Sequence, residues 1–344
     1  MNAYSQDILS QPEALREALD HYPLAALEPI LRGLNEQAFD RILMAGMGAS
    51  FNAAYPAYLQ LARLPIPVLM INAAELLHSL ESLISARTLL WLNSQSGHSV
   101  ELVRLLEQVQ TRPPACILAS VNDQASPLAQ AADICLPIYA GAEATVSTKT
   151  YSNMLAVNTL AATQLSGGNA TAALAELQAA AAAMAGYLDD WQQHVHTLDS
   201  LLGDFENLFI LGRGVSMSSV WNGALICKEA AKCAFEGMHA ADFRHGPLEL
   251  AQPGFTALVL AGSPATAGLN RELALDIAEY GGRSLWVDSV PDPQLPTVLL
   301  PKTSELARPL VEILPLQMLT LLMAGRKNIQ AGQFRHISKI TTKE

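Results

Sequence analysis

A cluster of hydroxyl and amide side chains lies between a segment with the pattern of a strand and a segment with the pattern of a helix. Residues 88–92 form a short apolar run typical of a buried strand, and residues 100–108 have the pattern of a helix. Between them lies Asn93-Ser94-Gln95-Ser96-Gly97-His98-Ser99. Free amides, the positive end of a helix dipole and short hydroxyl donors at one turn suit an anion. A simple helix cap needs only one such residue, so the segment favours a phosphate site.

A second polar segment opens a later helix. It reads Thr145-Val146-Ser147-Thr148-Lys149-Thr150, with hydroxyls and one cation at the predicted first turn. On its own this pattern fits a helix cap followed by a solvated lysine as well as it fits a ligand site.

General acid–base chemistry has candidates further along the chain. Lys228-Glu229 ends the segment that starts at Trp221, and Arg244-His245-Gly246-Pro247-Leu248 follows. A carboxylate and an imidazole are the usual groups for moving protons. A helical glutamate is also commonly a solvated surface residue, and a single histidine is commonly structural. Spacing alone leaves both interpretations open.

Two glycine pairs raise the alternative of a dinucleotide site. Gly46-x-Gly48 follows an apolar run, and Glu75 lies where a ribose ligand would be expected. The third glycine of that fingerprint is absent, because Phe51 occupies its position and Met217 does so in the second pair. The pairs therefore predict tight strand-to-helix turns, and no cofactor is expected.

Composition excludes several classes of protein. Of 344 residues, 50% are apolar and 15% are charged, yet no apolar run is long enough to span a bilayer. The first residues include Asp7 and no basic residue, so we expect no signal peptide and a cytoplasmic protein. The net charge of −11 argues against nucleic acid as a partner. His194 and His196 are two positions apart and form no helical metal pair, so no metal site is expected.

The order of elements predicts an α/β fold built twice. Short apolar runs at 41–45, 67–72, 88–92, 115–120 and 134–137 alternate with helix-length segments, as in a parallel sheet covered on both faces. The plan restarts at 207–211, with later runs at 256–261, 284–288 and 298–301. Gly46, Gly48 and Ser50 recur as Gly212, Gly214 and Ser216, each 166 positions later (212 − 46, 214 − 48, 216 − 50). We therefore predict two tandem doubly wound domains of flavodoxin-like type.

The predicted boundaries follow from this pattern and from one alanine-rich tract. Residues 1–33 form an N-terminal helical segment, with a helix start at Gln11-Pro12, and residues 34–165 form the first domain. The tract at 160–184 is rich in alanine and favours a helical linker, placed at 166–200. Residues 201–330 form the second domain, and 331–344 form a tail.

Taken together, these motifs resemble the SIS (sugar isomerase) domain family, and within it the two-lobed isomerase domain of glucosamine-6-phosphate synthase. The resemblance rests on Ser94-Gln95-Ser96-Gly97, Val146-Ser147-Thr148-Lys149, Leu211-Gly212-Arg213-Gly214, Lys228-Glu229, His245-Gly246-Pro247-Leu248 and the terminal Ile337-Ser338-Lys339-Ile340-Thr341. It covers nearly the whole chain in order.

The resemblance implies a role for each group of residues. The sugar phosphate would be held by Ser50, Ser94, Gln95, Ser96 and Ser99, with Ser147 and Lys149 nearby. Glu229 would move the proton between C1 and C2, and Lys339, on a tail that folds over the site, would contact the open-chain sugar. His245 would open the sugar ring from the partner subunit, which implies a homodimer.

The departures from the synthase pattern narrow the function. Residue 2 is asparagine where the synthase has its nucleophilic cysteine, so we expect no glutaminase domain and no glutamine hydrolysis. Asn222 and Ile226 replace a glutamate and a lysine on the helix of Glu229, where they would line the same pocket. Ala49 replaces a threonine, with hydroxyls remaining close by.

The expected function is therefore that of a phosphosugar enzyme. It would interconvert aldose and ketose phosphates, deaminate an amino-sugar phosphate to a ketose phosphate and ammonia, or do both. The alternative is a non-catalytic phosphosugar sensor that regulates a protein partner.

Overall fold

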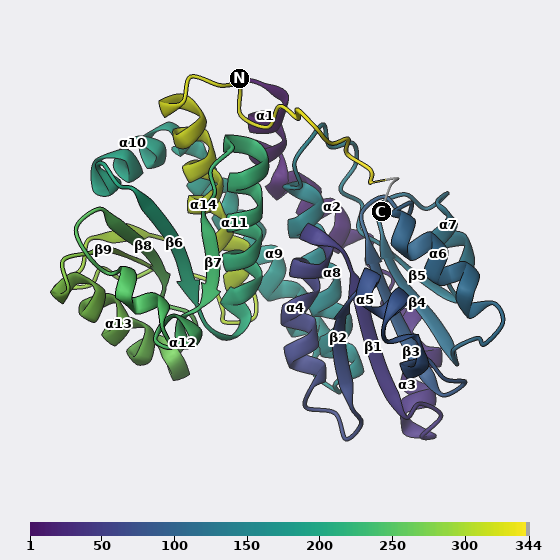
Figure 1. Ribbon diagram of the computed structural model, residues 1–344. Helices are drawn as coiled ribbons and strands as arrows, with labels where there is room; N and C mark the ends of the chain where they lie inside the picture. The colour runs from purple at the N-terminus through teal and green to yellow at the C-terminus, as the bar shows by residue number, and fades with distance from the viewer. Residues whose placement is uncertain (342–344) are drawn as a thin grey trace. The chain divides into compact units, whose positions relative to one another are not determined.

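The computed structural model describes residues 1–341, which form two compact units (Figure 1). The first lobe comprises Glu13–Glu143, Ser147–Gln178 and the tail from Arg335. The second lobe comprises Met1–Pro12, Ala144–Val146 and Ala179–Phe334. The sequence-based boundaries of the five segments stay a prediction.

The first lobe is built on a parallel sheet with the strand order β2-β1-β3-β4-β5. The strands are β1 (Arg41–Gly46), β2 (Val68–Asn72), β3 (Thr88–Ser94), β4 (Cys116–Val121) and β5 (Ile134–Pro137). All seven residues of β3 are buried, as expected of a central strand covered on both faces.

Helices cover both faces of this sheet. On one face, α5 (Ala73–His78), α6 (Val100–Val109) and α7 (Pro127–Ala131) bury leucine and alanine side chains against β1, β3 and β4. On the other, α4 (Gly48–Leu61) packs on β1, β2 and β3 and against α8 (Lys149–Leu165). The remaining helices are α2 (Gln11–Asp20), whose first two residues belong to the second lobe, and α3 (Glu28–Asn35).

The second lobe repeats the plan with the strand order β10-β9-β8-β6-β7. The strands are β6 (Asn207–Gly212), β7 (Glu236–His239), β8 (Phe255–Leu260), β9 (Arg283–Asp288) and β10 (Thr297–Leu299). One face packs on α12 (Ala240–Phe243) and α13 (Pro264–Glu279), and the other carries α11 (Met217–Ala231), which packs on α14 (Arg308–Arg326). The helices α1 (Ala3–Leu9) and α10 (Trp191–Leu202) complete this lobe, and α9 (Ala170–Asp189) crosses the division between the units.

The predicted fold class is confirmed: each sheet is parallel, five-stranded and covered by helices. The strand β7 was not predicted from the sequence, and the strand predicted at 256–261 is β8, which ends at Leu260. In residues 1–341, every helix is too short or too polar to cross a membrane.

Candidate functional site

The serine loop (residues 94–99) joins the end of β3 to the start of α6. Its backbone is folded by its own hydroxyls: the Gly97 N–H donates to Ser94 Oγ (3.0 Å) and the His98 N–H donates to Ser96 Oγ (3.1 Å). Gly97 has φ +66°, and a Cβ there would lie 2.0 Å from Ser126 Oγ. Only glycine fits both the left-handed backbone and the close contact.

Ser50 reaches the same loop from the neighbouring strand-to-helix turn. Its hydroxyl accepts a hydrogen bond from the Gln95 N–H (3.2 Å), and Ser94 Oγ lies 3.4 Å from Ser99 Oγ. This contact arises because β1 and β3 are adjacent parallel strands, so the turns that follow them share one edge of the sheet. The structure thus brings Ser50, Ser94, Gln95, Ser96 and Ser99 into one loop cluster.

The loop offers donors for an anion but carries no basic side chain except His98. Ser94 and Ser96 are buried, while Gln95, His98 and Ser99 are half-buried. Affinity for an oxyanion would come from hydroxyls, backbone amides and the N-terminal dipole of α6. Gly46 supports the arrangement at β1, since a Cβ there would approach the Asn93 carbonyl oxygen to 2.8 Å. Gly46 therefore serves close packing, while Gly48, with φ +50°, has the left-handed backbone of the predicted tight turn.

A buried chain of hydrogen bonds lies directly beneath the serine loop. Trp91 Nε1 donates to Ser120 Oγ (2.9 Å), Ser120 Oγ donates to Asn158 Oδ1 (2.6 Å), and Asn158 Nδ2 donates to Asn93 Oδ1 (2.7 Å). All four side chains are fully buried. The chain ties β3, β4 and α8 together one residue before Ser94. Sequence reasoning missed it, although polar residues inside buried runs were a usable signal.

The segment that opens α8 is organised around Glu143, which sequence reasoning also missed. Glu143 Oε1 accepts from the Thr148 N–H (2.8 Å), Thr148 Oγ1 (3.0 Å) and the Thr150 N–H (3.1 Å), while Oε2 accepts from Thr150 Oγ1 (2.7 Å). The carboxylate thus lies at the positive end of α8. Of the two residues predicted here, Ser147 is half-buried and Lys149 donates to the Ala142 carbonyl (2.6 Å).

The C-terminal tail meets both polar segments of the first lobe. Lys339 Nζ lies 2.5 Å from Glu143 Oε2, and the Val100 N–H donates to the Thr341 carbonyl (3.3 Å). Figure 1 draws this end of the chain in yellow near α6. Residues 342–344 of the predicted tail lie outside the described residues. The tail therefore connects the segment after β5 with the first amide of the helix that follows the serine loop.

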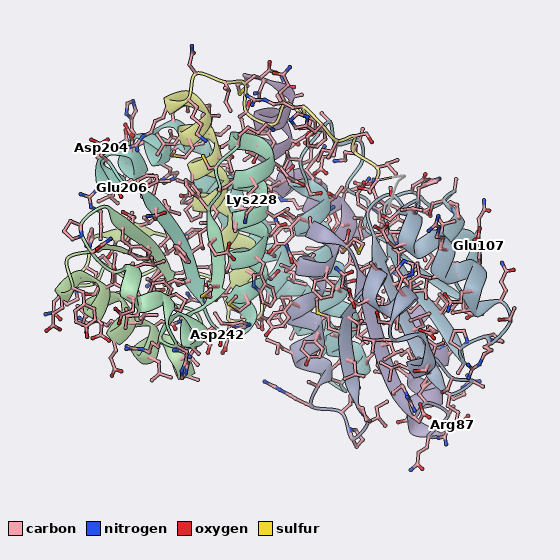
Figure 2. The ribbon with its side chains drawn as sticks, in the orientation of Figure 1. Arg87, Glu107, Asp204, Glu206, Lys228 and Asp242 are labelled. Carbon is pink, nitrogen blue, oxygen red and sulfur yellow. The ribbon has the colours of Figure 1, made fainter. Side chains whose placement is uncertain are left out.

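The predicted acid–base residues belong to the second lobe. Glu229 is half-buried near the end of α11, next to the exposed Lys228 (Figure 2). His245 is exposed in the turn after α12, where its backbone N–H donates to the Asp242 carbonyl (2.9 Å). Their roles in catalysis stay a prediction, and the serine loop and Lys339 belong to the first lobe.

Asn222 and Ile226 have no solvent-exposed surface. Both polar atoms of the Asn222 side chain lack a hydrogen-bond partner among residues 1–341. A buried amide without partners costs stability, which sets Asn222 apart from ordinary core residues. Whether the two side chains line a ligand pocket stays a prediction.

The turn after β6 is the counterpart of the Ser50 turn, but its chemistry differs. Ser216 Oγ donates to Glu312 Oε1 (2.9 Å), and Glu312 is fully buried on α14. Burial raises the pKa of Glu312 from 4.5 to about 7, against the lowering effect of Arg308 and Ser216. In the second lobe the serine after the first strand thus faces a carboxyl group, whereas the equivalent Ser50 faces a loop amide. A carboxylate repels a phosphate, so this arrangement disfavours a second phosphate site.

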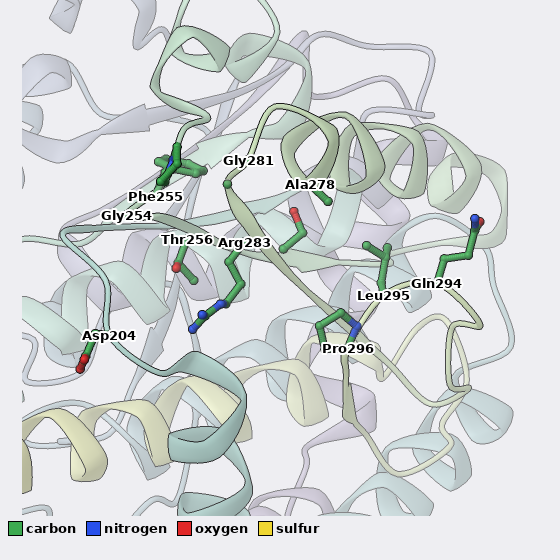
Figure 3. A pocket seen from close by; sticks show the side chains of 13 residues that line it. Asp204, Gly254, Phe255, Thr256, Ala278, Gly281, Arg283, Gln294, Leu295 and Pro296 are labelled. Atoms are coloured by element: carbon green, nitrogen blue, oxygen red, sulfur yellow. The ribbon is translucent and has the colours of Figure 1, made fainter.

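A cavity of about 390 Å³ lies at the opposite, amino-terminal edge of the second sheet (Figure 3). Gly254, Phe255 and Thr256 line it where β8 begins, and Arg283 lines it where β9 begins. Thr256 and Arg283 are paired in register, and Figure 3 shows their side chains next to each other. No residue predicted from the sequence for the site lines this cavity.

Comparison with known proteins agrees with the fold. Residues 37–164 match the model of the SIS domain. Over 98% of its length the chain is 28% identical to the glutamine–fructose-6-phosphate aminotransferase (isomerizing) of Thermococcus kodakarensis, and it spans 58% of that protein.

Solved structures share the fold at low sequence identity. The C-terminal domain of glucosamine-fructose-6-phosphate aminotransferase from Francisella tularensis is 21% identical with a TM-score of 0.85, covering 97% of this chain and 98% of that one. Glucosamine-6-phosphate deaminase from Thermotoga maritima is 19% identical with a TM-score of 0.74, covering 99% of each chain. The chain thus contains a SIS domain and is homologous to the isomerase part of glutamine–fructose-6-phosphate aminotransferase.

Proposed function

We propose that the protein is a phosphosugar enzyme that isomerises an aldose phosphate to a ketose phosphate, deaminates an amino-sugar phosphate, or does both. In deamination, water replaces the amino nitrogen, so that a hexosamine phosphate gives a ketose phosphate and ammonia. The observation that carries the proposal is the serine loop, where hydroxyls from two adjacent strand ends meet at a helix N-terminus. No cofactor is needed for this chemistry.

Phosphate binding is the task of the serine loop in this proposal. Ser50, Ser94, Gln95, Ser96 and Ser99 hold the phosphate through hydroxyls and amides, with Ser147 and Lys149 beside them. Lys339, held near Glu143 by the tail, contacts the open-chain sugar.

Proton transfer is the task of the second lobe. The carboxylate of Glu229 takes the proton from one of C1 and C2 and returns it to the other, through an enediol or enolamine. Donors near the carbonyl oxygen stabilise the negative charge that develops there. His245 opens the ring and is supplied by the partner subunit of a homodimer, which its exposure permits. The setting is a cytoplasmic one.

The second candidate is a non-catalytic phosphosugar sensor. It is favoured by Asn222 and Ile226, which put a neutral amide and an alkyl chain where the synthase pattern has an acid and a base. A sensor would keep the serine loop and bind phosphosugars without changing them.

Turnover separates the two candidates. The purified protein is incubated with phosphorylated hexosamines, ketohexoses and fructosamine derivatives, and both ammonia and ketose phosphate are followed. We expect turnover of at least one substrate, and a loss of about a hundredfold or more in Glu229→Gln. Glu279→Gln, the same change at an exposed position of the second lobe, serves as the control. If phosphosugars raise the melting temperature but none is converted, the enzyme proposal fails and the sensor replaces it.

A further inference from the structure

The environment of Glu143 is unusual for an acidic residue in a connecting segment. Its side chain is 0% exposed, and both carboxylate oxygens are engaged by the start of α8 through Thr148 and Thr150. The fifth donor is the ammonium group of Lys339, 196 positions away along the chain. The Lys339 side chain retains 22% exposure.

The start of α8 accounts for four of these five contacts, two from backbone N–H groups and two from threonine hydroxyls, but not for the fifth. A carboxylate at a helix N-terminus satisfies free N–H groups and interacts favourably with the dipole. Interaction with the start of α8 requires only Thr148 and Thr150, which lie close to Glu143 along the chain. The contact with Lys339 adds an ion pair to a carboxylate already removed from water, where losing one partner is costly.

The tail that carries Lys339 has little burial of its own. Residues 335–338 are exposed, whereas Lys339 and Ile340 are half-buried. The ion pair at Glu143 and the hydrogen bond from the Val100 N–H to Thr341 lie two residues apart along the tail. These contacts place the tail between the segment after β5 and the helix that follows the serine loop.

We propose that Glu143 is a positioning residue for Lys339. It holds the lysine ammonium at the carboxyl edge of the first sheet and thereby docks residues 339–341 beside the serine loop. The part of this inference that concerns turnover rests on the proposed function, because it takes Lys339 as the group that contacts the sugar. The docking of the tail does not depend on it.

Proteolysis tests the docking without any substrate. Trypsin cleavage after Arg335 is followed by mass spectrometry in the wild type, Glu143→Gln, Lys339→Met and the double variant. Because cleavage reports the population of the open tail, we expect each single variant to be cut about tenfold faster or more. The double variant should be cut no faster than the singles, since both changes break one contact. Glu107→Gln, an exposed residue of α6 labelled in Figure 2, should match the wild type.

Kinetics tests the positioning role against a merely structural one. Glu143→Gln should lower kcat about tenfold or more while KM changes by about threefold or less, because Glu143 bonds to Thr148, Thr150 and Lys339 rather than to the serine loop that holds the phosphate. Glu143→Asp, which keeps the charge, should recover part of kcat. Wild-type cleavage rates in folded Glu143→Gln would overturn the proposal. If Glu143→Gln does not fold, slow cleavage of Lys339→Met overturns it equally. A wild type that converts no sugar contradicts the proposed function but leaves the cleavage result standing.

Discussion

Backbone conformation and packing both require glycine at position 97. The positive φ of +66° disfavours any side chain, and the Ser126 hydroxyl occupies the space where a Cβ would stand. The residue lies in the middle of the serine loop, where its N–H is donated to Ser94 Oγ. A larger residue would therefore distort the loop that is proposed to bind phosphate.

We predict that Gly97→Ala weakens both stability and phosphosugar binding. Gly141→Ala is the matched control, since Gly141 has φ +65° in the same lobe but nothing within 4 Å of the added Cβ. Both changes should cost about 1 kcal/mol through backbone strain, and Gly97→Ala about 1–3 kcal/mol more through overpacking. Urea denaturation gives the stabilities, and the melting-temperature rise with a phosphosugar gives binding. Equal effects of the two variants would contradict the prediction.

Residues of the candidate site were predictable from the sequence where they are contiguous. Ser94, Gln95, Ser96 and Ser99 stand within six positions, so their chemistry is visible in one segment. Glu143 was not predictable, because its significance comes from Lys339, 196 positions later. A single acidic residue in a connecting segment has no pattern that distinguishes it from a solvated one.

At the scale of the element, β3 is both the centre of the first sheet and the support of the serine loop. Apolar runs predicted this strand and most others, because a strand covered on both faces must be apolar throughout. The edge strand β7 was missed, since Glu236-Gly237-Met238-His239 is half-buried or exposed and contains no apolar run. The pairing of β7 with β6 depends on the tertiary fold, so it could not be predicted from the local sequence.

The buried hydrogen bonds under β3 should act as one unit. We predict that Asn158→Ala and Ser120→Ala each destabilise the protein by about 1–3 kcal/mol, because each leaves a buried partner unsatisfied. Their side chains are joined at 2.6 Å, so the double variant should lose less than the sum of the single losses, by about 1 kcal/mol. Denaturation midpoints of the four proteins measure this coupling, and strict additivity would rule it out.

At the scale of the whole molecule, one plan is used twice with different chemistry at equivalent positions. The repeat of Gly46, Gly48 and Ser50 predicted the duplication, and both sheets have the same strand order. The divergence was not predictable, because Ser216 meets Glu312 across 96 positions. In the first lobe the equivalent serine accepts from a loop amide, and in the second it donates to a buried acid.

Glu312 should make the stability of the second lobe depend on pH. Its pKa is raised from 4.5 to about 7, so the folded form binds the proton more tightly than the unfolded chain. Its contribution is therefore most favourable below about pH 4.5 and is lost as the pH rises to about 7. Glu312→Gln removes this dependence while keeping an acceptor for Ser216. The stability of the variant relative to wild type should rise by about 3 kcal/mol across this range.

Hydrogen exchange locates this effect within the molecule. Exchange rates in β6, α11 and α14 are compared between Glu312→Gln and wild type at pH 5 and at pH 8. We expect the variant to gain relative protection at pH 8 in these elements, because the wild type then holds a buried charge near Asp288 that Arg308 only partly offsets. Glu305→Gln, an exposed position before α14, should show no such change. A difference of the same size at both pH values would mean that Glu312 does not titrate between pH 5 and pH 8, which would contradict the prediction.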